Sequence, residues 1–98
     1  LLIHIAASDG RPDGLTVDAE GYLLSVLFDG AAILRISPAG HIDRRIELPI
    51  LRPTSCALTG DNRHLFITTA RIGLTSEDLR QKPASGALLQ LEYEEALY

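Results

Sequence analysis

The chain has 98 residues, of which 46% are hydrophobic, and it carries a formal net charge of −4 at pH 7. The hydrophobic content excludes a disordered segment, and the acidic balance argues against a nucleic-acid-binding protein, for which a basic patch is expected. No apolar run approaches the roughly 18 residues of a membrane helix, so a membrane partner is not expected. The single cysteine, Cys56, rules out an internal disulfide and favours a reducing, cytoplasmic compartment.

The first predicted element is a short apolar strand over residues 1–5. Because the chain begins inside this strand, on leucine rather than methionine, we expect it to be part of a longer protein. Four further strands are predicted at 15–17, 22–27, 32–37 and 42–48. The inner ones are apolar on nearly every residue and the last alternates apolar with polar residues, so burial should fall from the first strand to the fourth. Asp29-Gly30 predicts a tight hairpin between the second and third strands.

A second set of strands is predicted at 55–59, 63–69 and 87–92. The connection over residues 70–85 is long, and within it Thr75 and Asp78 have the spacing of a helix capping box. A short helix is therefore expected there, ending before Pro83, which cannot continue it. This set lacks a fourth, outermost strand.

The two sets repeat each other. Arg11-Pro12 recurs as Arg52-Pro53, 41 positions later, and the segments that follow each copy align, 15–18 with 56–59 and 22–27 with 64–69. Self-similarity at about 40 to 45 residues, with several short strands per unit, is typical of a β-propeller blade. The sequence therefore predicts an all-β fold that is a propeller fragment and a single partial domain. Its parts are 1–5 as the last strand of a preceding blade, 12–48 as a full blade, and 53–93 as a second blade without its outer strand.

Strictly alternating strand direction sorts the loops onto two rims. One rim is predicted to carry Asp13, Asp29, Thr54 and Arg71. The opposite rim is predicted to carry Asp18, Glu20 and Asp61. Asp18 and Glu20 therefore cannot join Asp13 in a calcium loop of the EF-hand type.

Asp13 is the main candidate for chemistry. It stands in a Pro-Asp-Gly segment just before a buried strand, where the second repeat has Thr54. A turn aspartate is the plain structural interpretation. The functional interpretation is a carboxylate that points into the central channel, where it can bind a hard divalent cation or act as a base. Arg11, Thr54 and Arg71 share its rim and are candidate contacts for a substrate.

Other catalytic patterns are weak. The three histidines, His4, His41 and His64, have no zinc-ligand spacing. No serine stands in a Gly-x-Ser-x-Gly setting, and there is no glycine-rich phosphate loop. Cys56 lies in an apolar strand, where a packing role is expected.

Taken in order, these segments resemble the senescence marker protein / gluconolactonase / regucalcin family. The similarity covers nearly the whole chain, through 11–23, the Asp29-Gly30 hairpin, 47–49, 52–57, 65–74 and 77–88. The resemblance implies a six-bladed propeller, of which this chain forms the last two blades, and metal-dependent hydrolysis of an aldonolactone. Leu24 stands where many relatives carry tryptophan, a difference that concerns packing in an inner strand.

The resemblance also implies a divalent metal on the channel axis, held by a glutamate, an asparagine and an aspartate from separate blades. Asp13 matches that aspartate, which is both a metal ligand and the general base, and the other two ligands are expected upstream of this chain. The implied cofactor is calcium, with zinc, magnesium or manganese as alternatives, and the implied partner is a small sugar lactone. The 98 residues alone are then expected to be inactive. A non-catalytic calcium-binding propeller and a purely scaffolding one remain as alternative functions.

Overall fold

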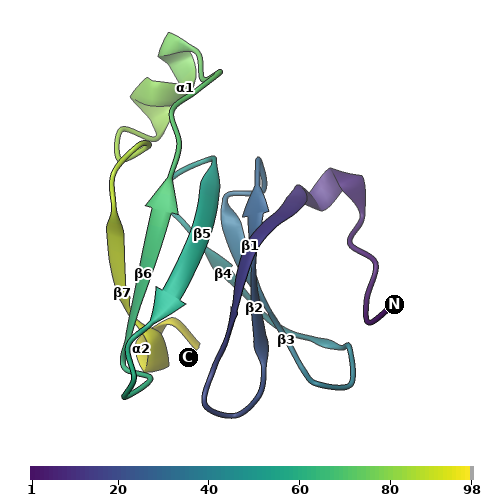
Figure 1. Cartoon of the computed structure of the whole chain (residues 1–98). Coiled ribbons are helices and arrows are strands. Elements are labelled where there is room, and N and C mark those ends of the chain that lie inside the picture. The colour runs from purple at the N-terminus through teal and green to yellow at the C-terminus, as the bar shows by residue number, and fades with distance from the viewer. Residues whose placement is uncertain (98) are drawn as a thin grey trace.

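The chain forms two antiparallel sheets that stand side by side (Figure 1). This computed structural model describes residues 1–97. The first sheet contains four strands in sequential order, β1 (Arg11–Val17), β2 (Leu23–Phe28), β3 (Ala32–Ile36) and β4 (Ile42–Glu47). The second contains three, β5 (Pro53–Leu58), β6 (His64–Thr69) and β7 (Leu89–Glu92).

The hairpin between β2 and β3 forms where the sequence predicts it. Asp29 has φ of 66°, a left-handed conformation that aspartate tolerates, and the Gly30 amide donates to the Leu27 carbonyl at 2.9 Å. In the second sheet the long connection carries helix α1 (Ser76–Gln81). Its capping box is formed in both directions between Thr75 and Asp78, as the spacing predicts.

The main hydrophobic core lies between the two sheets. The first sheet contributes Leu24, Val26 and Ile33, the β4 end contributes Ile46, and β5 and β6 contribute Cys56, Leu65 and Ile67. Leu24 is completely buried in this core. Because residues alternate faces along a strand, the intervening side chains of each sheet point outward to a second face.

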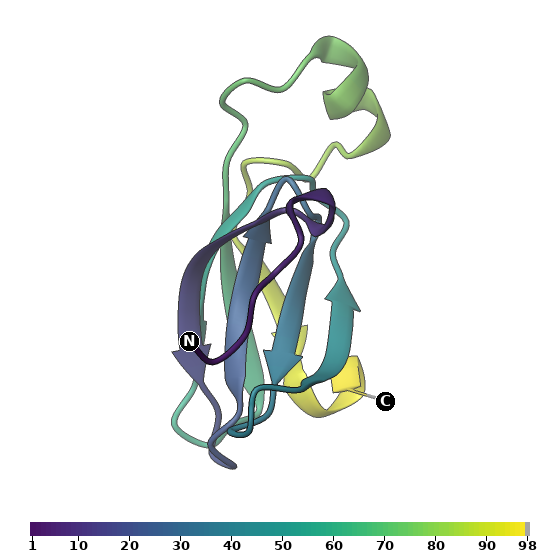
Figure 2. The same cartoon turned by 90° about the vertical axis from the view of Figure 1, so that its right-hand side faces the viewer.

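A second, smaller cluster lies on the outward face of the first sheet. It consists of Leu27, Ala32, Leu34 and Ile36, with Ile3 and Ile5 packed against them. Residues 1–5 are extended along this face but form no strand, so the strand predicted there is not observed (Figure 2). The physical reason is that a strand needs a neighbouring edge for its backbone hydrogen bonds, and this segment contacts the sheet through its side chains. A short 3-10 helix, η1 (Ala7–Asp9), links it to β1.

The described part of the second unit ends in a helix and not in a strand. After β7 the chain turns into a short helix, α2 (Tyr93–Leu97), whose first residue is buried in the main core. No helix over residues 1–97 has the length and apolar character needed to span a bilayer.

The two rims predicted from strand direction are present. In Figure 1 the connection into β1, the β2–β3 hairpin, the connection into β5 and the α1 loop lie at the upper rim. The turns between β1 and β2, β3 and β4, and β5 and β6 lie at the lower rim with α2. The upper rim therefore holds the candidate functional residues.

Candidate active site

Asp13 is placed by a bulge in the inner strand of the first sheet. Pro12 pairs with Leu27 of β2 and Leu15 pairs with Ser25, so Asp13 and Gly14 together oppose one β2 residue. A bulge of this kind bends the strand and redirects a side chain. Asp13 is therefore a strand residue at a bulge, and the turn interpretation of Pro-Asp-Gly is wrong for this chain.

Gly14 allows the two inner strands to approach each other. A Cβ atom added at Gly14 would lie 2.7 Å from the Ser55 Cβ and 2.8 Å from the Ser55 Cα, closer than real Cβ atoms come. The glycine of Pro-Asp-Gly thus serves the contact between β1 and β5. It holds the two bulges, at Asp13 and at Thr54, on neighbouring strands.

The Asp13 side chain is exposed and lines a hollow of about 320 Å³ together with Arg11, Pro12 and Phe28. Within residues 1–97, no hydrogen bond or ion pair engages its carboxylate. The part of the chain that the structure describes contains no group of three histidine, cysteine or acidic side chains close enough to hold a metal ion. Asp13 can therefore supply one ligand to a cation but not a complete site.

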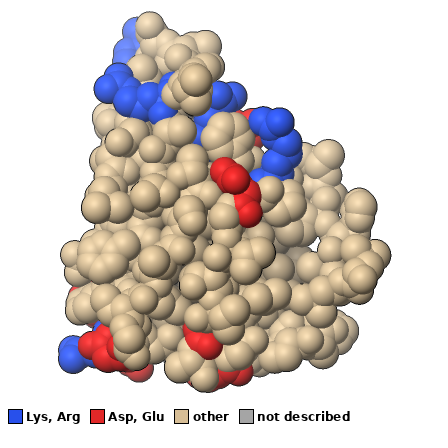
Figure 3. All heavy atoms as spheres, viewed as in Figure 1, with Lys and Arg blue, Asp and Glu red and all other residues tan. Residues whose placement is uncertain are grey.

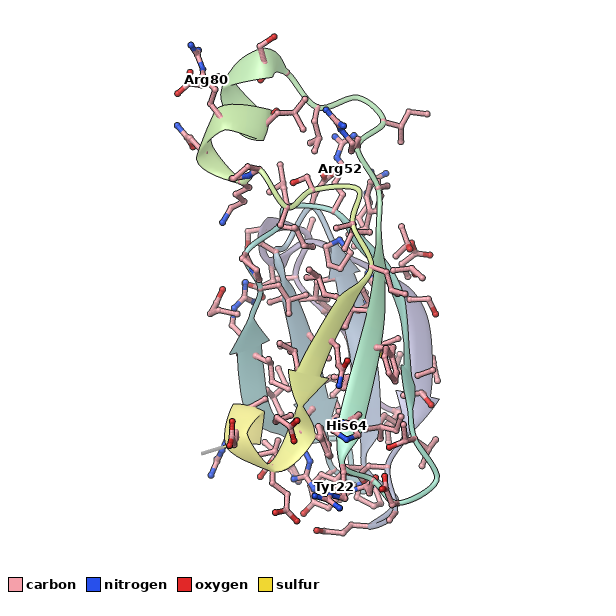
Figure 4. The ribbon with its side chains drawn as sticks, turned by 90° about the vertical axis from the view of Figure 1, so that its left-hand side faces the viewer. Tyr22, Arg52, His64 and Arg80 are labelled. Atoms are coloured by element: carbon pink, nitrogen blue, oxygen red, sulfur yellow. The ribbon has the colours of Figure 1, made fainter. Side chains whose placement is uncertain are left out.

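Two arginines from the repeated Arg-Pro segments converge beside this hollow. The Asp29 carboxylate accepts from Arg52 Nε at 2.5 Å and from Arg11 Nη2 at 3.3 Å. Both guanidinium groups also lie over the Phe28 ring, 5.1 Å and 5.4 Å from its centroid. Arg52 further donates to the Ile72 carbonyl at the base of the α1 loop, where Figure 4 shows it. Basic side chains gather on this rim in Figure 3.

The Arg11 side chain is 71% exposed although it pairs with Asp29. Of the three candidate substrate contacts, it is the one that lines the same hollow as Asp13. Thr54 occupies the equivalent bulge in β5, between Pro53 and Ser55, but its hydroxyl bonds to the hydroxyl and carbonyl of Thr68. Arg71 lies against Gly86, where an added Cβ would strike its side chain.

A buried polar cluster lies at the opposite rim. The Asp18 carboxylate accepts from Arg35 Nε at 3.1 Å, from the Tyr93 hydroxyl at 2.8 Å, and from the Glu20 and Tyr22 amides, both at 2.9 Å. Arg35 also pairs with Asp43 at 2.6 Å and stacks over the Tyr22 ring, which Figure 4 shows at the lower end. Since Tyr93 belongs to the second sheet unit and Asp18 to the first, this cluster links the two.

The pKa values of this cluster follow from its geometry. Burial opposes the charge of Asp18, but hydrogen bonds from Tyr93, the Tyr22 amide and Arg35 outweigh it and hold the Asp18 pKa below its usual value. Burial also opposes the charge of Arg35. Its hydrogen bonds outweigh this effect and raise the pKa of Arg35 above its usual value, and the bond to Asp43 contributes most. Burial, assisted by the neighbouring Asp18 carboxylate, raises the pKa of Tyr93. Each group keeps its ordinary charge state, so the cluster is structural.

Cys56 is buried between the sheets. Burial raises the pKa of its thiol to about 11, so the reactive thiolate is scarce at neutral pH. This agrees with the packing role predicted from its apolar strand.

Comparison with known proteins identifies the family. Residues 1–71 match the family model described as the SMP-30/gluconolactonase/LRE-like region. The chain belongs to this family. It is 42% identical over 82 residues to 6-deoxy-6-sulfogluconolactonase of Pseudomonas putida, covering 83% of this chain and 28% of that protein. It is 36% identical over 80 residues to L-arabinolactonase of Azospirillum brasilense, covering 82% of this chain and 26% of that protein. It is 39% identical over 85 residues to regucalcin of Danio rerio, covering 85% of this chain and 29% of that protein.

Solved structures of family relatives share the fold of this SMP-30/gluconolactonase/LRE-like chain. A calcium-binding regucalcin from Agrobacterium tumefaciens superposes with a TM-score of 0.85 at 28% identity, over 93% of this chain and 31% of its own. A luciferin-regenerating enzyme superposes with a TM-score of 0.67 at 29% identity, over 83% and 27%. The all-β propeller-fragment prediction is thereby confirmed. The chain spans less than a third of the length of the curated relatives and structures named here.

The structure brings Asp13 and Arg11 into one hollow and places Thr54 on the neighbouring inner strand. The sequence interpretation missed two features. It treated Asp29 as a hairpin residue only, whereas Asp29 and Phe28 hold both repeated arginines. It gave no role to Asp18, and the available signal was its place directly after the strand predicted at 15–17. The metal-binding and catalytic roles of Asp13 remain predictions.

Proposed function

We propose that this chain supplies two blades of a sugar-lactone hydrolase, in which Asp13 is a metal ligand and the general base. The observation that carries the proposal is the Asp13 carboxylate itself. It is exposed at an inner-strand bulge, it lines a hollow, and no group among residues 1–97 neutralises it. Buried structural carboxylates such as Asp18 are fully hydrogen-bonded, and Asp13 is not.

Hydrolysis of a lactone requires that a water lose a proton and that negative charge on the carbonyl oxygen be stabilised. The Asp13 carboxylate can accept the proton of a water held within hydrogen-bonding distance. A bound divalent cation supplies polarisation of the carbonyl oxygen. Asp13 offers a hard oxygen ligand suited to such a cation, and further ligands must come from outside the described residues.

Calcium is the proposed metal, because the regucalcin structure superposing on this chain is named a calcium-binding protein. Zinc, magnesium and manganese are the alternatives. The proposed substrate is a sugar lactone, because two relatives are named for lactones of sugar acids. Arg11, which reaches the hollow with most of its side chain exposed, is the proposed contact for lactone oxygens.

The experiment is a segment exchange. This chain replaces the region of the Pseudomonas lactonase that corresponds to it, where the two are 42% identical over 82 residues. Hydrolysis of that enzyme's lactone is followed in a pH-stat, with calcium binding by calorimetry in parallel. Removal of a general base lowers the rate by about 10²- to 10⁴-fold, and we expect a loss of this size in kcat/KM for Asp13→Asn.

Asp9→Asn is the matched control, because Asp9 is an exposed carboxylate on η1 close to Asp13 in sequence. It should hydrolyse the lactone at the parent rate. Full activity in the Asp13→Asn exchange would refute the assignment. We expect the 98-residue chain alone to be inactive, because it holds one ligand only.

A non-catalytic calcium-binding role is the second candidate, and the calcium-binding name of the Agrobacterium relative favours it. It would show as an exchange protein that binds calcium through Asp13 but has no lactone turnover. A purely scaffolding role would leave calcium affinity unchanged in Asp13→Asn.

A further inference from the structure

Two arginines at equivalent places in the repeat meet at one carboxylate. Arg11 and Arg52 each precede a proline at the start of an inner strand, and both contact Asp29 at the β2–β3 hairpin. A guanidinium group is not deprotonated in proteins, so the two arginines bring two positive charges to one negative charge. The Asp29 trio, that is Arg11, Arg52 and Asp29, therefore carries one uncompensated positive charge.

The charge of Arg52 is engaged within the fold. Its Nε donates to Asp29 Oδ1 at 2.5 Å, its Nη1 donates to the Ile72 carbonyl, and its side chain is 22% exposed (Figure 4). Its field also reaches Asp78, where it lowers the pKa of the carboxyl after the larger effect of the hydrogen bonds with Thr75. Arg52 is therefore the structural member of the pair, and it joins the α1 loop to the hairpin.

Arg11 is engaged much less. Its Nη2 lies 3.3 Å from Asp29 Oδ2, which is longer than the contact that Arg52 makes with the same carboxylate, and its side chain is 71% exposed. The Phe28 ring lies beneath it, 5.4 Å from the guanidinium to the centroid, and supports the group without neutralising it. Over residues 1–97 its guanidinium donates to Asp29 alone, so most of its five N–H groups are available to a ligand.

The Arg11 side chain lies at the junction of the two sheets. Arg11 pairs with Phe28, whose side chain has the same direction as those of Leu24 and Val26, because residues two apart share one face of a strand. Leu24 and Val26 pack in the core between the sheets. Arg52 of the second unit lies over the same Phe28 ring. The groups that hold the Arg11 guanidinium therefore come from both of the blades that the structure describes.

Arg11 lines the same hollow as Asp13, and among the described residues no ion pair joins the two side chains. In the proposed function the Asp13 charge is taken up by a divalent cation, so it does not compensate Arg11. Two residues along a strand are about 7 Å apart. Arg11 would therefore meet a part of the substrate that lies several bonds away from the carbonyl at Asp13.

We propose that Arg11 selects sugar lactones that carry a second, acidic group. This inference rests on the proposed function, in which Asp13 acts at the lactone carbonyl. A guanidinium binds the oxygens of a sulfonate, phosphate or carboxylate through charge-assisted hydrogen bonds, which are about twice as strong as bonds to neutral oxygens. The hydroxyl and ring oxygens of an unsubstituted sugar lactone are neutral, so they gain little from the uncompensated charge of the Asp29 trio. The chemistry shared by the preferred substrates is a terminal oxyanion.

The test uses the exchange protein described under the proposed function. Neutral gluconolactone is compared with the same lactone carrying a sulfonate, a phosphate or a carboxylate at its terminal carbon, and kcat/KM is measured for each in a pH-stat. For at least one anionic lactone, Arg11→Gln should lower kcat/KM about tenfold more than for gluconolactone, as the loss of one hydrogen bond to a charged group predicts. The three anionic lactones show which acid is preferred. Arg11→Lys keeps the charge without the planar fork and should lie between parent and Arg11→Gln.

Arg80→Gln is the matched control. Arg80 is 75% exposed and pairs with Glu77 on α1, so the variant removes the same charge outside the hollow. It should leave the preference for anionic lactones as it is in the parent. Added salt should weaken that preference in the parent, because salt screens interactions between exposed charges. It should have little effect on the preference that remains in Arg11→Gln.

An equal preference for anionic lactones in the parent and in Arg11→Gln would overturn the inference, and so would an equal loss in Arg80→Gln. The proposed function fails by a different result, namely full activity of Asp13→Asn on neutral gluconolactone.

Calorimetry provides a second measurement that does not need turnover. Gluconate is compared with gluconate that carries a terminal phosphate or sulfonate. Arg11→Gln should weaken binding of at least one of these doubly acidic products about tenfold more than binding of gluconate. Equal weakening for all the acids, or no binding of any of them by the parent exchange protein, would refute the role of Arg11.

Discussion

Tyr93→Phe tests the link between the two sheets. The Tyr93 hydroxyl donates to Asp18 Oδ2 at 2.8 Å and accepts from Arg35 Nε at 3.0 Å, while its ring is 1% exposed. The substitution keeps the buried ring, so the hydrophobic contribution is unchanged. Arg35 Nε retains Asp18 as an acceptor at 3.1 Å, so the main loss is one hydrogen bond to a buried carboxylate. Hydrogen bonds to charged groups contribute about 1.5 to 3 kcal/mol, and we expect the free energy of unfolding to fall by that amount.

The assay is urea denaturation followed by circular dichroism, at one protein concentration for all variants because association would shift apparent stability. Tyr22→Phe is the matched control. The Tyr22 ring stacks on Arg35 at 3.8 Å, and its hydroxyl has no hydrogen-bond partner within residues 1–97, so its loss should cost little. If Tyr93→Phe were as stable as Tyr22→Phe, the hydroxyl would not link the sheets.

Two further predictions concern stability. Asp18→Asn should destabilise the chain at pH 7, and the difference from the parent should shrink as the pH falls below about 4, near the pKa of a free aspartate. Folding lowers the pKa of Asp18, so its carboxylate stabilises the chain above the pKa of the unfolded state, and this stabilisation is lost as the pH falls through the folded-state pKa. If the difference in the free energy of unfolding between parent and variant stayed constant with pH in urea titrations, the argument would be contradicted. Gly14→Ala should cost about 1 to 3 kcal/mol by overpacking against Ser55. Gly60→Ala, where an added Cβ meets nothing within 4 Å, should leave the urea midpoint unchanged, and equal midpoints for the two alanine variants would contradict the close approach.

Local patterns in the sequence were enough to place the strands and the capped helix. The alternation of apolar and polar residues over 42–48 and the apolar run of β2 gave the positions of these strands, because the period of two in a strand is a property of neighbouring residues. The 41-residue repeat predicted two sheets of the same design. The failure was at residues 1–5, where an apolar run was interpreted as a strand although pairing depends on a partner edge that local sequence does not contain.

For the candidate site, the sequence placed Asp13, Thr54 and Arg71 on one rim because alternating strand direction requires it. It could not determine how each side chain is engaged. Thr54 bonds to Thr68 in the next strand, and Arg11 shares the Asp29 carboxylate with Arg52, 41 residues away. Such contacts depend on which strands become neighbours.

The sequence by itself determined the blade design: four consecutive strands, the tight hairpin at Asp29, and the side of the sheet on which each loop lies. These follow from periodicity and turn chemistry over a few residues. The predicted fall in burial from the first strand to the fourth is wrong, because β1 has no buried residue whereas β2 and β3 are mostly buried. Burial depends on which sheet packs on each face, and strand polarity alone does not specify that. Only the tertiary structure decided that Asp13 lies in a bulge facing open space while Asp18 is buried under Tyr93, 75 residues further along the chain. Asp13 lies within β1 and Asp18 directly follows it, and what distinguishes a free carboxylate from a structural one is the set of groups that folding brings to it.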